Sequence, residues 1–134
     1  MEKVLHFLKE NPVFFLATND NGQPRVRPFG AVIARNGALY ICTNNQKKVF
    51  QQIKADARIE ICGFNGAAAE WLRLEATAAE EDCIEARIQM LEENAMLKDV
   101  YKPDDGLFAV IKLSNVTATF WSMASLEPLD TIQF

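Results

Sequence analysis

The stretch Leu39–Ile53, LYICTNNQKKVFQQI, most constrains the fold because it changes from strand to helix within a few residues. Its first four residues are apolar and β-prone and follow an Asn-Gly turn, which predicts a buried strand. Its last part places Val49, Phe50 and Ile53 on one helical face. The stretch therefore predicts a strand that leads directly into an amphipathic helix.

The junction between this strand and helix, Thr43–Lys48, collects features that favour an anion. Asn44 or Asn45 is expected to cap the helix. The first N–H groups of the helix, the positive end of its dipole and two lysines then meet at one point, which suits a phosphate. A polar turn with two solvated lysines accounts for the same residues, so the junction alone leaves both interpretations open.

Composition limits the classes of protein to consider. A chain of 134 residues predicts one domain, residues 1–134, and 49% apolar residues suffice for a core. The net charge of −4 argues against a nucleic-acid partner. No apolar run approaches the ~20 residues of a membrane span, and the charged N-terminus lacks the pattern of a signal peptide. Three widely spaced cysteines indicate reduced thiols in a cytoplasmic protein.

The order of patterns predicts an α+β fold with a predominantly antiparallel sheet. Helices are expected over residues 2–10, over the end of the central stretch, and from the acidic residues 80–82, which fall in the first turn of a helix with a buried stripe of Ile84, Ile88, Leu91 and Ala95. Consecutive strands with short turns predict an antiparallel meander near the N-terminus, in a sheet that curls into a barrel. The six or seven strands are expected over residues 13–18, 25–34, 39–42, 58–64, 68–79 and 107–121, bent near 114–115, with a short final strand over 129–134.

The second predicted strand has an unusual face. Because side chains alternate along a strand, Arg25, Arg27 and Phe29 share one side. Two arginines beside an aromatic ring can hold a phosphate or carboxylate, although an ordinary solvated face accounts for them more simply. Pro28 cannot donate a ladder hydrogen bond and Gly30 has no side chain, so we expect an edge or a bulge here.

The strand over 68–79 also has two unlike faces. One carries only leucine and alanine, which predicts a core face. The other carries Trp71, Arg73 and Glu75, which are too polar for a core and too aromatic for bare solvent. This face is typical of a ligand wall or a subunit interface.

Most catalytic motifs are absent from the sequence. One histidine, His6, and three scattered cysteines lack the close spacing of a zinc site, so no metal is expected. There is no G-x-S-x-G, Walker A or G-x-G-x-x-G motif. No catalytic residue can therefore be assigned, and an enzyme of this sequence would depend on a bound organic cofactor.

The ordered segments resemble the pyridoxamine 5′-phosphate oxidase-like family of FMN-binding split β-barrels. The closer resemblance is to its small clostridial-type members related to nitroimidazole-resistance proteins. It covers nearly the whole chain. The segments that carry it are FFLAT, RVRPFG, LYICTNNQKKVFQQI, RIEICGF, EWLRLEATA, PDDGLF and TATFWS.

The resemblance implies a split barrel with three flanking helices and a homodimer that binds FMN in clefts between its subunits. Arg27, Pro28 and Phe29 would line the flavin edge, and Thr43, Asn44 and Gln46 would approach the ring or the ribityl chain. Lys47 would bind the phosphate, with Lys48 as the alternative. Trp71 and Arg73 would border the flavin or the partner subunit. Trp121 and Ser122 would reach the partner's cofactor.

Two departures bear on the activity that the resemblance implies. Residues 123–134 contain neither the arginine nor the histidine that pyridoxamine phosphate oxidases use for their substrate, and Asn-Gln-Lys-Lys replaces Ser-Arg-Lys before the helix. The expectation is therefore an FMN-dependent oxidoreductase acting on another small molecule. The alternatives are a non-catalytic flavin- or haem-binding carrier or stress-related module, and a deazaflavin-dependent reductase.

Overall fold

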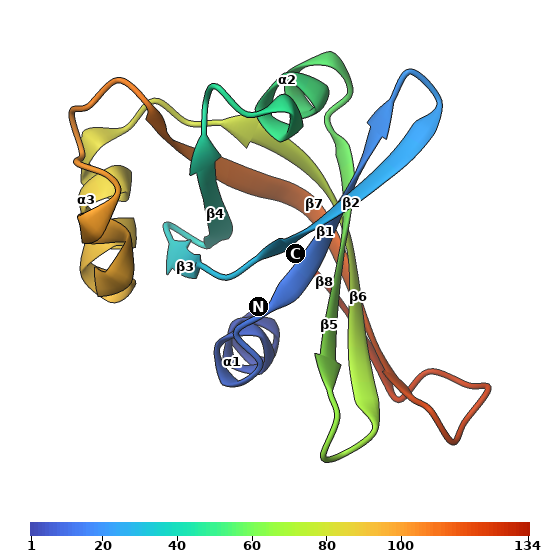
Figure 1. Cartoon of the computed structure of the whole chain (residues 1–134). Coiled ribbons are helices and arrows are strands. Elements are labelled where there is room, and N and C mark those ends of the chain that lie inside the picture. The colour runs from blue at the N-terminus through green and yellow to red at the C-terminus, as the bar shows by residue number, and fades with distance from the viewer.

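The computed structural model describes residues 1–134 and contains one eight-stranded antiparallel sheet with three α-helices (Figure 1). The helices are α1 (Glu2–Glu10), α2 (Lys48–Ala55) and α3 (Ile84–Glu93), followed by the 3₁₀ helix η1 (Ala95–Asp99). The strands are β1 (Phe14–Asp20), β2 (Gln23–Phe29), β3 (Val32–Arg35), β4 (Ala38–Asn44), β5 (Arg58–Asn65), β6 (Glu70–Glu80), β7 (Phe108–Ser122) and β8 (Asp130–Gln133).

The sheet has the strand order β2-β1-β5-β6-β7-β4-β3, and β8 also pairs with β7. The two ends of this order, β2 and β3, are consecutive in the chain, yet they do not pair with each other. The sheet therefore curls without closing. The expected α+β split barrel with three helices is confirmed.

The predicted strand over 25–34 is wrong as a single element. It divides into β2, which pairs with β1, and β3, which pairs with β4. The break falls at Gly30-Ala31, directly after Phe29, where the chain leaves one ladder and joins another. The expected three-strand meander is therefore absent, and the sheet gains an eighth strand.

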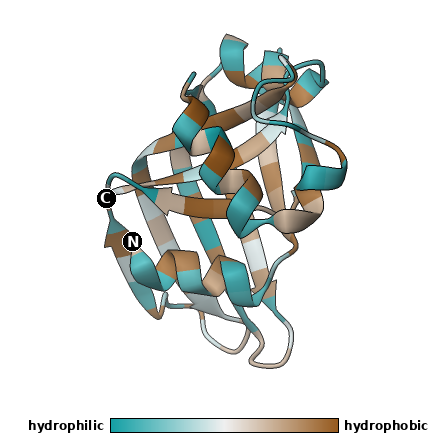
Figure 2. Ribbon diagram, turned by 90° about the vertical axis from the view of Figure 1, so that its left-hand side faces the viewer, coloured by the Kyte–Doolittle hydropathy of each residue, from teal (hydrophilic) through white to brown (hydrophobic).

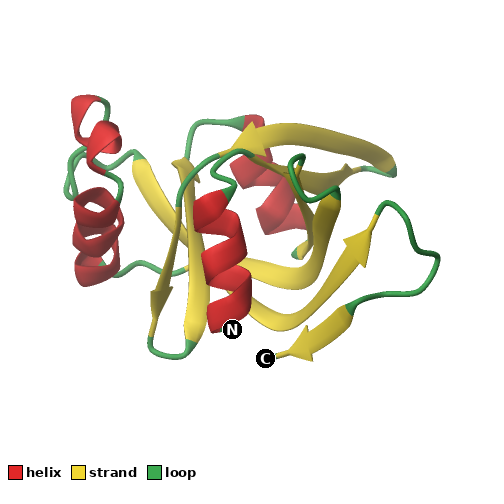
Figure 3. Ribbon diagram, turned by 90° about the horizontal axis from the view of Figure 1, so that it is seen from below, coloured by secondary structure: helices red, strands yellow, loops and turns green.

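Strand β7 joins the two halves of the barrel. Along one edge it pairs with β6, and along the other with β4 and then β8. The bend expected near 114–115 is confirmed: Asn115 has a φ of 52°, and the register with β6 shifts between Glu75 and Thr77. The short final strand is confirmed as β8. The chain ends lie close together (Figure 3), and Lys3 Nζ lies 2.6 Å from Asp130 Oδ2.

Two hydrophobic cores stabilise the fold. The larger one fills the barrel, and a smaller one lies between α3 and the strands β3, β4 and β7. Because β4 contributes to both cores, it is buried on both faces, which explains its continuous apolar run. Figure 2 shows polar and apolar residues alternating along α1, whose Val4 and Leu8 are buried.

The stripe predicted for α3 is only partly right. Leu91 is buried, but Ile84 and Ile88 are each 39% exposed, and the helix packs instead through Ala86 and Met90. The helix also begins at Ile84 and not at the acidic residues 80–82, and Ala95 is exposed in η1. Two hydrogen bonds join α3 to neighbouring segments in this orientation: Gln89 Nε2 donates to the Ala34 carbonyl at 3.0 Å, and Arg87 Nε donates to the Pro103 carbonyl at 2.7 Å. None of the helices has the length and apolar character needed to span a bilayer.

Candidate functional site

A cavity of about 470 Å³ lies where the end of β2, the end of β4, the start of α2 and the η1 segment meet. This volume falls within the range of small-molecule sites. More than half of its lining residues are hydrophobic. It brings together five of the residues that the sequence assigned to a cofactor: Arg27, Pro28, Phe29, Thr43 and Lys47.

Arg27 is fixed in the cavity wall by neutral oxygen atoms. Its Nη2 donates to Gln52 Oε1 at 2.7 Å, and its Nη1 donates to Thr18 Oγ1 at 2.8 Å and to the Leu16 carbonyl at 3.2 Å. No carboxylate lies within ion-pair distance of it. Burial, together with the nearby charge of Arg25, lowers the pKa of Arg27. Its positive charge is therefore available to a ligand.

Lys47 lies at the mouth of the cavity, where α2 begins. It is itself the N-cap residue of α2, so the expectation that Asn44 or Asn45 caps this helix is wrong. No side chain accepts a hydrogen bond from the N–H groups of the first turn. Those groups, the helix dipole and the Lys47 ammonium, which is also without an ion pair, thus meet beside the cavity.

The two asparagines shape the turn before α2 instead of capping it. Asn44 Oδ1 accepts a hydrogen bond from the Gln46 backbone N–H at 2.8 Å. Asn45 Nδ2 donates to the Gly106 carbonyl, also at 2.8 Å, which ties the turn to the segment before β7. Asn44 and Gln46 do not line the cavity. Lys48 borders a separate polar hollow of about 410 Å³ on another side of α2.

Sequence reasoning did not assign several cavity residues. Cys42 precedes Thr43 on β4, and burial raises the pKa of its thiol to about 12. Met96, Leu97 and Tyr101 come from η1 and the residues after it, and the Tyr101 ring packs on Phe108 with centroids 4.8 Å apart. No local pattern marks these residues, because the docking of α3 brings their segment to the cavity.

Three of the other four predicted site residues, Trp71, Arg73 and Trp121, lie together on the outer face of the sheet, away from the cavity, whereas Ser122 follows Trp121 on β7 and therefore faces the opposite side of the strand. Trp71 and Trp121 stack with ring centroids 5.6 Å apart, and the guanidinium of Arg73 lies over both rings. Arg73 Nε also lies 2.9 Å from Glu60 Oε1. The Trp121 Nε1 atom is buried without a hydrogen-bond partner. Ser122 closes the strand, and its Oγ accepts from the Ala124 N–H at 3.2 Å.

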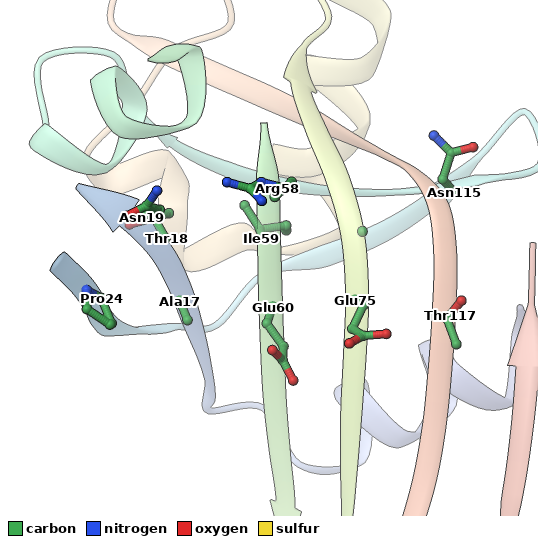
Figure 4. A pocket seen from close by; sticks show the side chains of 11 residues that line it. Ala17, Thr18, Asn19, Pro24, Arg58, Ile59, Glu60, Glu75, Asn115 and Thr117 are labelled. Atoms are coloured by element: carbon green, nitrogen blue, oxygen red, sulfur yellow. The ribbon is translucent and has the colours of Figure 1, made fainter. Parts of the chain in front are cut away.

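A second large hollow, of about 570 Å³, extends over β1, β5, β6 and β7. Figure 4 shows the carboxylates of Glu60 and Glu75 side by side on neighbouring strands, and these two residues are direct cross-strand partners. Its only cation, Arg58, is already paired with Asp56 at 2.7 Å. Because two carboxylates line this hollow and its cation is occupied, the cavity beside Arg27 is the better site for an anion.

No group of three or more histidine, cysteine, aspartate or glutamate side chains is arranged to hold a metal ion. The family model for pyridoxamine 5′-phosphate oxidase matches residues 1–122. The chain belongs to the pyridoxamine 5′-phosphate oxidase-like family. The expected resemblance is therefore confirmed.

Solved structures agree with this family. A NimC/NimA family protein from Clostridium acetobutylicum is 42% identical, with a TM-score of 0.93, and the match covers 100% of this chain and 92% of that one. Among curated protein sequences, none matches the chain.

Two more distant members of the fold differ in what their names say they bind. A pyridoxamine 5′-phosphate oxidase-related, FMN-binding protein from Nostoc punctiforme is 18% identical, with a TM-score of 0.73, covering 99% of this chain and 95% of that one. A heme-binding protein from Mycobacterium smegmatis is 19% identical, with a TM-score of 0.75, covering 95% of this chain and 55% of that one. At these identities the likeness shows a shared fold.

Proposed function

We propose that this pyridoxamine 5′-phosphate oxidase-like protein binds FMN in the cavity beside Arg27 and Lys47. The observation that carries the proposal is that two cations without carboxylate partners border one largely apolar cavity. A flat apolar ring that ends in a phosphate suits both parts of this lining. The FMN-binding relative supports the choice of flavin.

Each group of predicted residues has a place in this proposal. Lys47 and the start of α2 would hold the phosphate, and Arg27, Pro28 and Phe29 would lie along the flavin edge. Thr43, which is buried at the cavity wall, would approach the ring. Asn44 and Gln46 would orient the turn, and Lys48 remains the alternative phosphate ligand.

We further propose a homodimer in which the outer face of one subunit completes the site of the other. We define the outer sheet face by Phe15, Val26, Phe64, Trp71 and Trp121. Phe15, Val26 and Phe64 are 45–68% exposed. An exposed apolar face of this kind favours a protein partner. Arg73 and Ser122 would then lie at the interface or reach the partner's cofactor.

Flavin-dependent oxidoreduction of a small molecule is the activity we propose. Bound FMN would supply electron transfer that no side-chain constellation here provides, while this chain's residues would bind and orient the cofactor and shield it from water. The three cysteines are free thiols, which supports the expected cytoplasmic location. Oxidation of pyridoxamine phosphate itself remains disfavoured by the absence of arginine and histidine after Ser122.

Haem is the second candidate ligand because one relative is named for it. The cavity contains no histidine, and the only histidine, His6, is exposed on α1. The absence of a cavity histidine and the two cations without carboxylate partners support our choice of flavin over haem.

The test is an absorption spectrum of the purified protein before and after addition of FMN and desalting. Retained flavin bands would support the proposal, and loss of all flavin on desalting would oppose it. The FMN-loaded protein is then assayed for oxidation of NADH or NADPH with quinones, nitro compounds or dyes. No turnover above that of free FMN would identify a carrier. Parallel titration with haemin and with a deazaflavin tests the alternatives.

A further inference from the structure

The two arginines on one face of β2 have different partners. Arg25 Nε lies 3.2 Å from the carboxylate of Asp20, so its charge is compensated. Arg27 contacts only neutral oxygens. Since both arginines lie on the same short strand, the difference comes from the side chains that surround each one.

Gln52 is one of the two side chains that accept hydrogen bonds from Arg27, whereas Asp20 pairs with Arg25. Gln52 lies on α2, which packs on β1 (Figure 1), and the residue is only 8% exposed. Its Oε1 accepts from Arg27 Nη2 at 2.7 Å and from the Thr18 hydroxyl at 2.5 Å. Because a guanidinium has only donors, the oxygen of the amide must face it. Thr18, itself 5% exposed, links the two by accepting from Arg27 Nη1.

Burying the Gln52 amide costs free energy, which its hydrogen bonds to Arg27 and Thr18 offset. A buried amide requires hydrogen-bond partners, and an apolar residue would pack on β1 without that requirement. A glutamate would hold Arg27 more strongly through charge-assisted hydrogen bonds. It would also cancel the charge of the guanidinium. Only a neutral acceptor both orients Arg27 and leaves its charge free.

We propose that Gln52 is a positioning residue, which holds Arg27 through a neutral oxygen so that the full guanidinium charge acts on the flavin edge of bound FMN and, together with Lys47, adds to the positive potential that attracts an anion into the cavity. Thr18 completes the arrangement by linking both side chains. This inference rests on the proposed function for its ligand, FMN, and extends to inorganic phosphate as a simpler anion.

Two variants separate the effect of positioning Arg27 from the effect of its charge. Gln52→Glu keeps Arg27 in place and neutralises it, whereas Gln52→Met keeps the side-chain length and leaves Arg27 charged but held only by Thr18 and the backbone carbonyls. Gln51→Glu is the matched control, because Gln51 is the exposed neighbour on the same helix and adds the same charge. FMN affinity is measured by fluorescence titration, and stability by the thermal midpoint of the protein without added FMN.

We expect Gln52→Glu to bind FMN about tenfold or more weakly than Gln51→Glu, the scale of one lost charged contact. Its thermal midpoint should equal or exceed that of the control. Gln52→Met should also bind FMN more weakly, but with a lowered midpoint. A merely structural role would instead make affinity follow stability, so Gln52→Glu would bind FMN as well as the control.

Inorganic phosphate makes the inference independent of FMN. If the wild-type protein binds no FMN, the proposed function fails, and the same three variants are compared by the thermal shift that phosphate produces. A smaller shift in Gln52→Glu than in Gln51→Glu supports the role of Gln52. Equal shifts, or equal FMN affinities, overturn it. If Gln52→Glu does not fold, the inference is also overturned, because a held and neutralised Arg27 should stabilise the wall.

Discussion

Arg27 and Lys47 show how residues of one charge receive different roles from their surroundings. Arg27 donates hydrogen bonds to the Leu16 carbonyl, Thr18 and Gln52 and forms part of the cavity wall. Lys47 is exposed at the cavity mouth and has no ion pair. A fixed cation suits orientation of a rigid ring, and a mobile ammonium suits capture of a phosphate.

Replacing Lys47 with alanine should weaken FMN binding by ~1.5–3 kcal/mol, the range for a charge-assisted hydrogen bond. The dissociation constant is measured by fluorescence titration. Lys54→Ala is the control because it removes the same charge from the last turn of α2. Riboflavin, which lacks the phosphate, should bind Lys47→Ala and wild type equally. A larger loss in Lys48→Ala than in Lys47→Ala would move the phosphate to the other side of the helix.

Asp105 stabilises the segment between η1 and β7, which is hydrogen-bonded to the turn before α2. Its carboxylate accepts hydrogen bonds from the backbone N–H groups of Lys102, Leu107 and Phe108. These bonds, first among them the one from Lys102, lower the pKa of Asp105. The neighbouring Gly106 and Leu107 carbonyls accept from Asn45 in the turn before α2.

The pH dependence of this carboxylate has a defined sign. Because the pKa of Asp105 is lower in the folded state, its contribution to stability is complete above the unfolded value of ~3.9 and is lost as pH falls through the folded pKa. Asp105→Asn should therefore be less stable than wild type at pH 7, and the difference in stability between the two proteins should narrow below about pH 4. Urea denaturation midpoints at several pH values measure this. A difference in midpoint that stays constant with pH would contradict the proposed role of the Asp105 carboxylate.

At the scale of elements, α1 closes one side of the barrel by approaching β5 very closely. A Cβ atom added at Gly63 would lie 3.1 Å from Phe7 Cε1 and 3.4 Å from Leu8 Cδ2. Phe7 in turn packs edge-on against Phe120 of β7, with centroids 5.6 Å apart. Gly63 is thus the point on β5 where the missing side chain lets the helix dock.

Gly63→Ala should destabilise the fold by about 1–3 kcal/mol, because overpacking forces Phe7 away from its position. The change is measured as a shift in the chemical denaturation midpoint. Gly66→Ala is the control, because its added Cβ would meet only the Phe64 ring at 3.5 Å, an ordinary contact. Equal midpoints for Gly63→Ala and wild type would show that α1 has room to move.

At the scale of the whole molecule, the helices leave one face of the sheet uncovered. α1 and α2 pack on one side, and α3 covers β3 and β7. Only the outer sheet face, with Phe15, Val26 and the stacked tryptophans, lacks a covering element within this chain. That face is where we propose the second subunit to bind.

Phe15→Glu should convert the proposed homodimer into a monomer, because it places a charge in an apolar interface. Analytical ultracentrifugation measures the mass in solution. Ile88→Glu is the control, since Ile88 is partly exposed on α3 outside this face. FMN affinity should fall together with dimerisation if the partner completes the site. A wild-type protein that sediments as a monomer would contradict the proposed assembly.

The sequence alone determined the features that depend on neighbouring residues. Periodicity of two separated the core face of β6 from its Trp71 and Arg73 face, and the change of period placed the junction of β4 and α2. These patterns succeeded because alternation and helical repeat are properties of short segments. Five of the residues that were predicted from the motifs RVRPFG and TNNQKK to bind a cofactor also line the cavity.

The tertiary structure decided everything that depends on which strands pair. Local pattern could not divide the strand over 25–34, because each half satisfies a different ladder. Nor could it connect Arg27 with Thr18 and Gln52, or bring Tyr101 to the wall of a cavity formed by β2 and β4. These residues meet through the order of the sheet and the docking of helices, which are set by burial across the whole chain and leave no local signal.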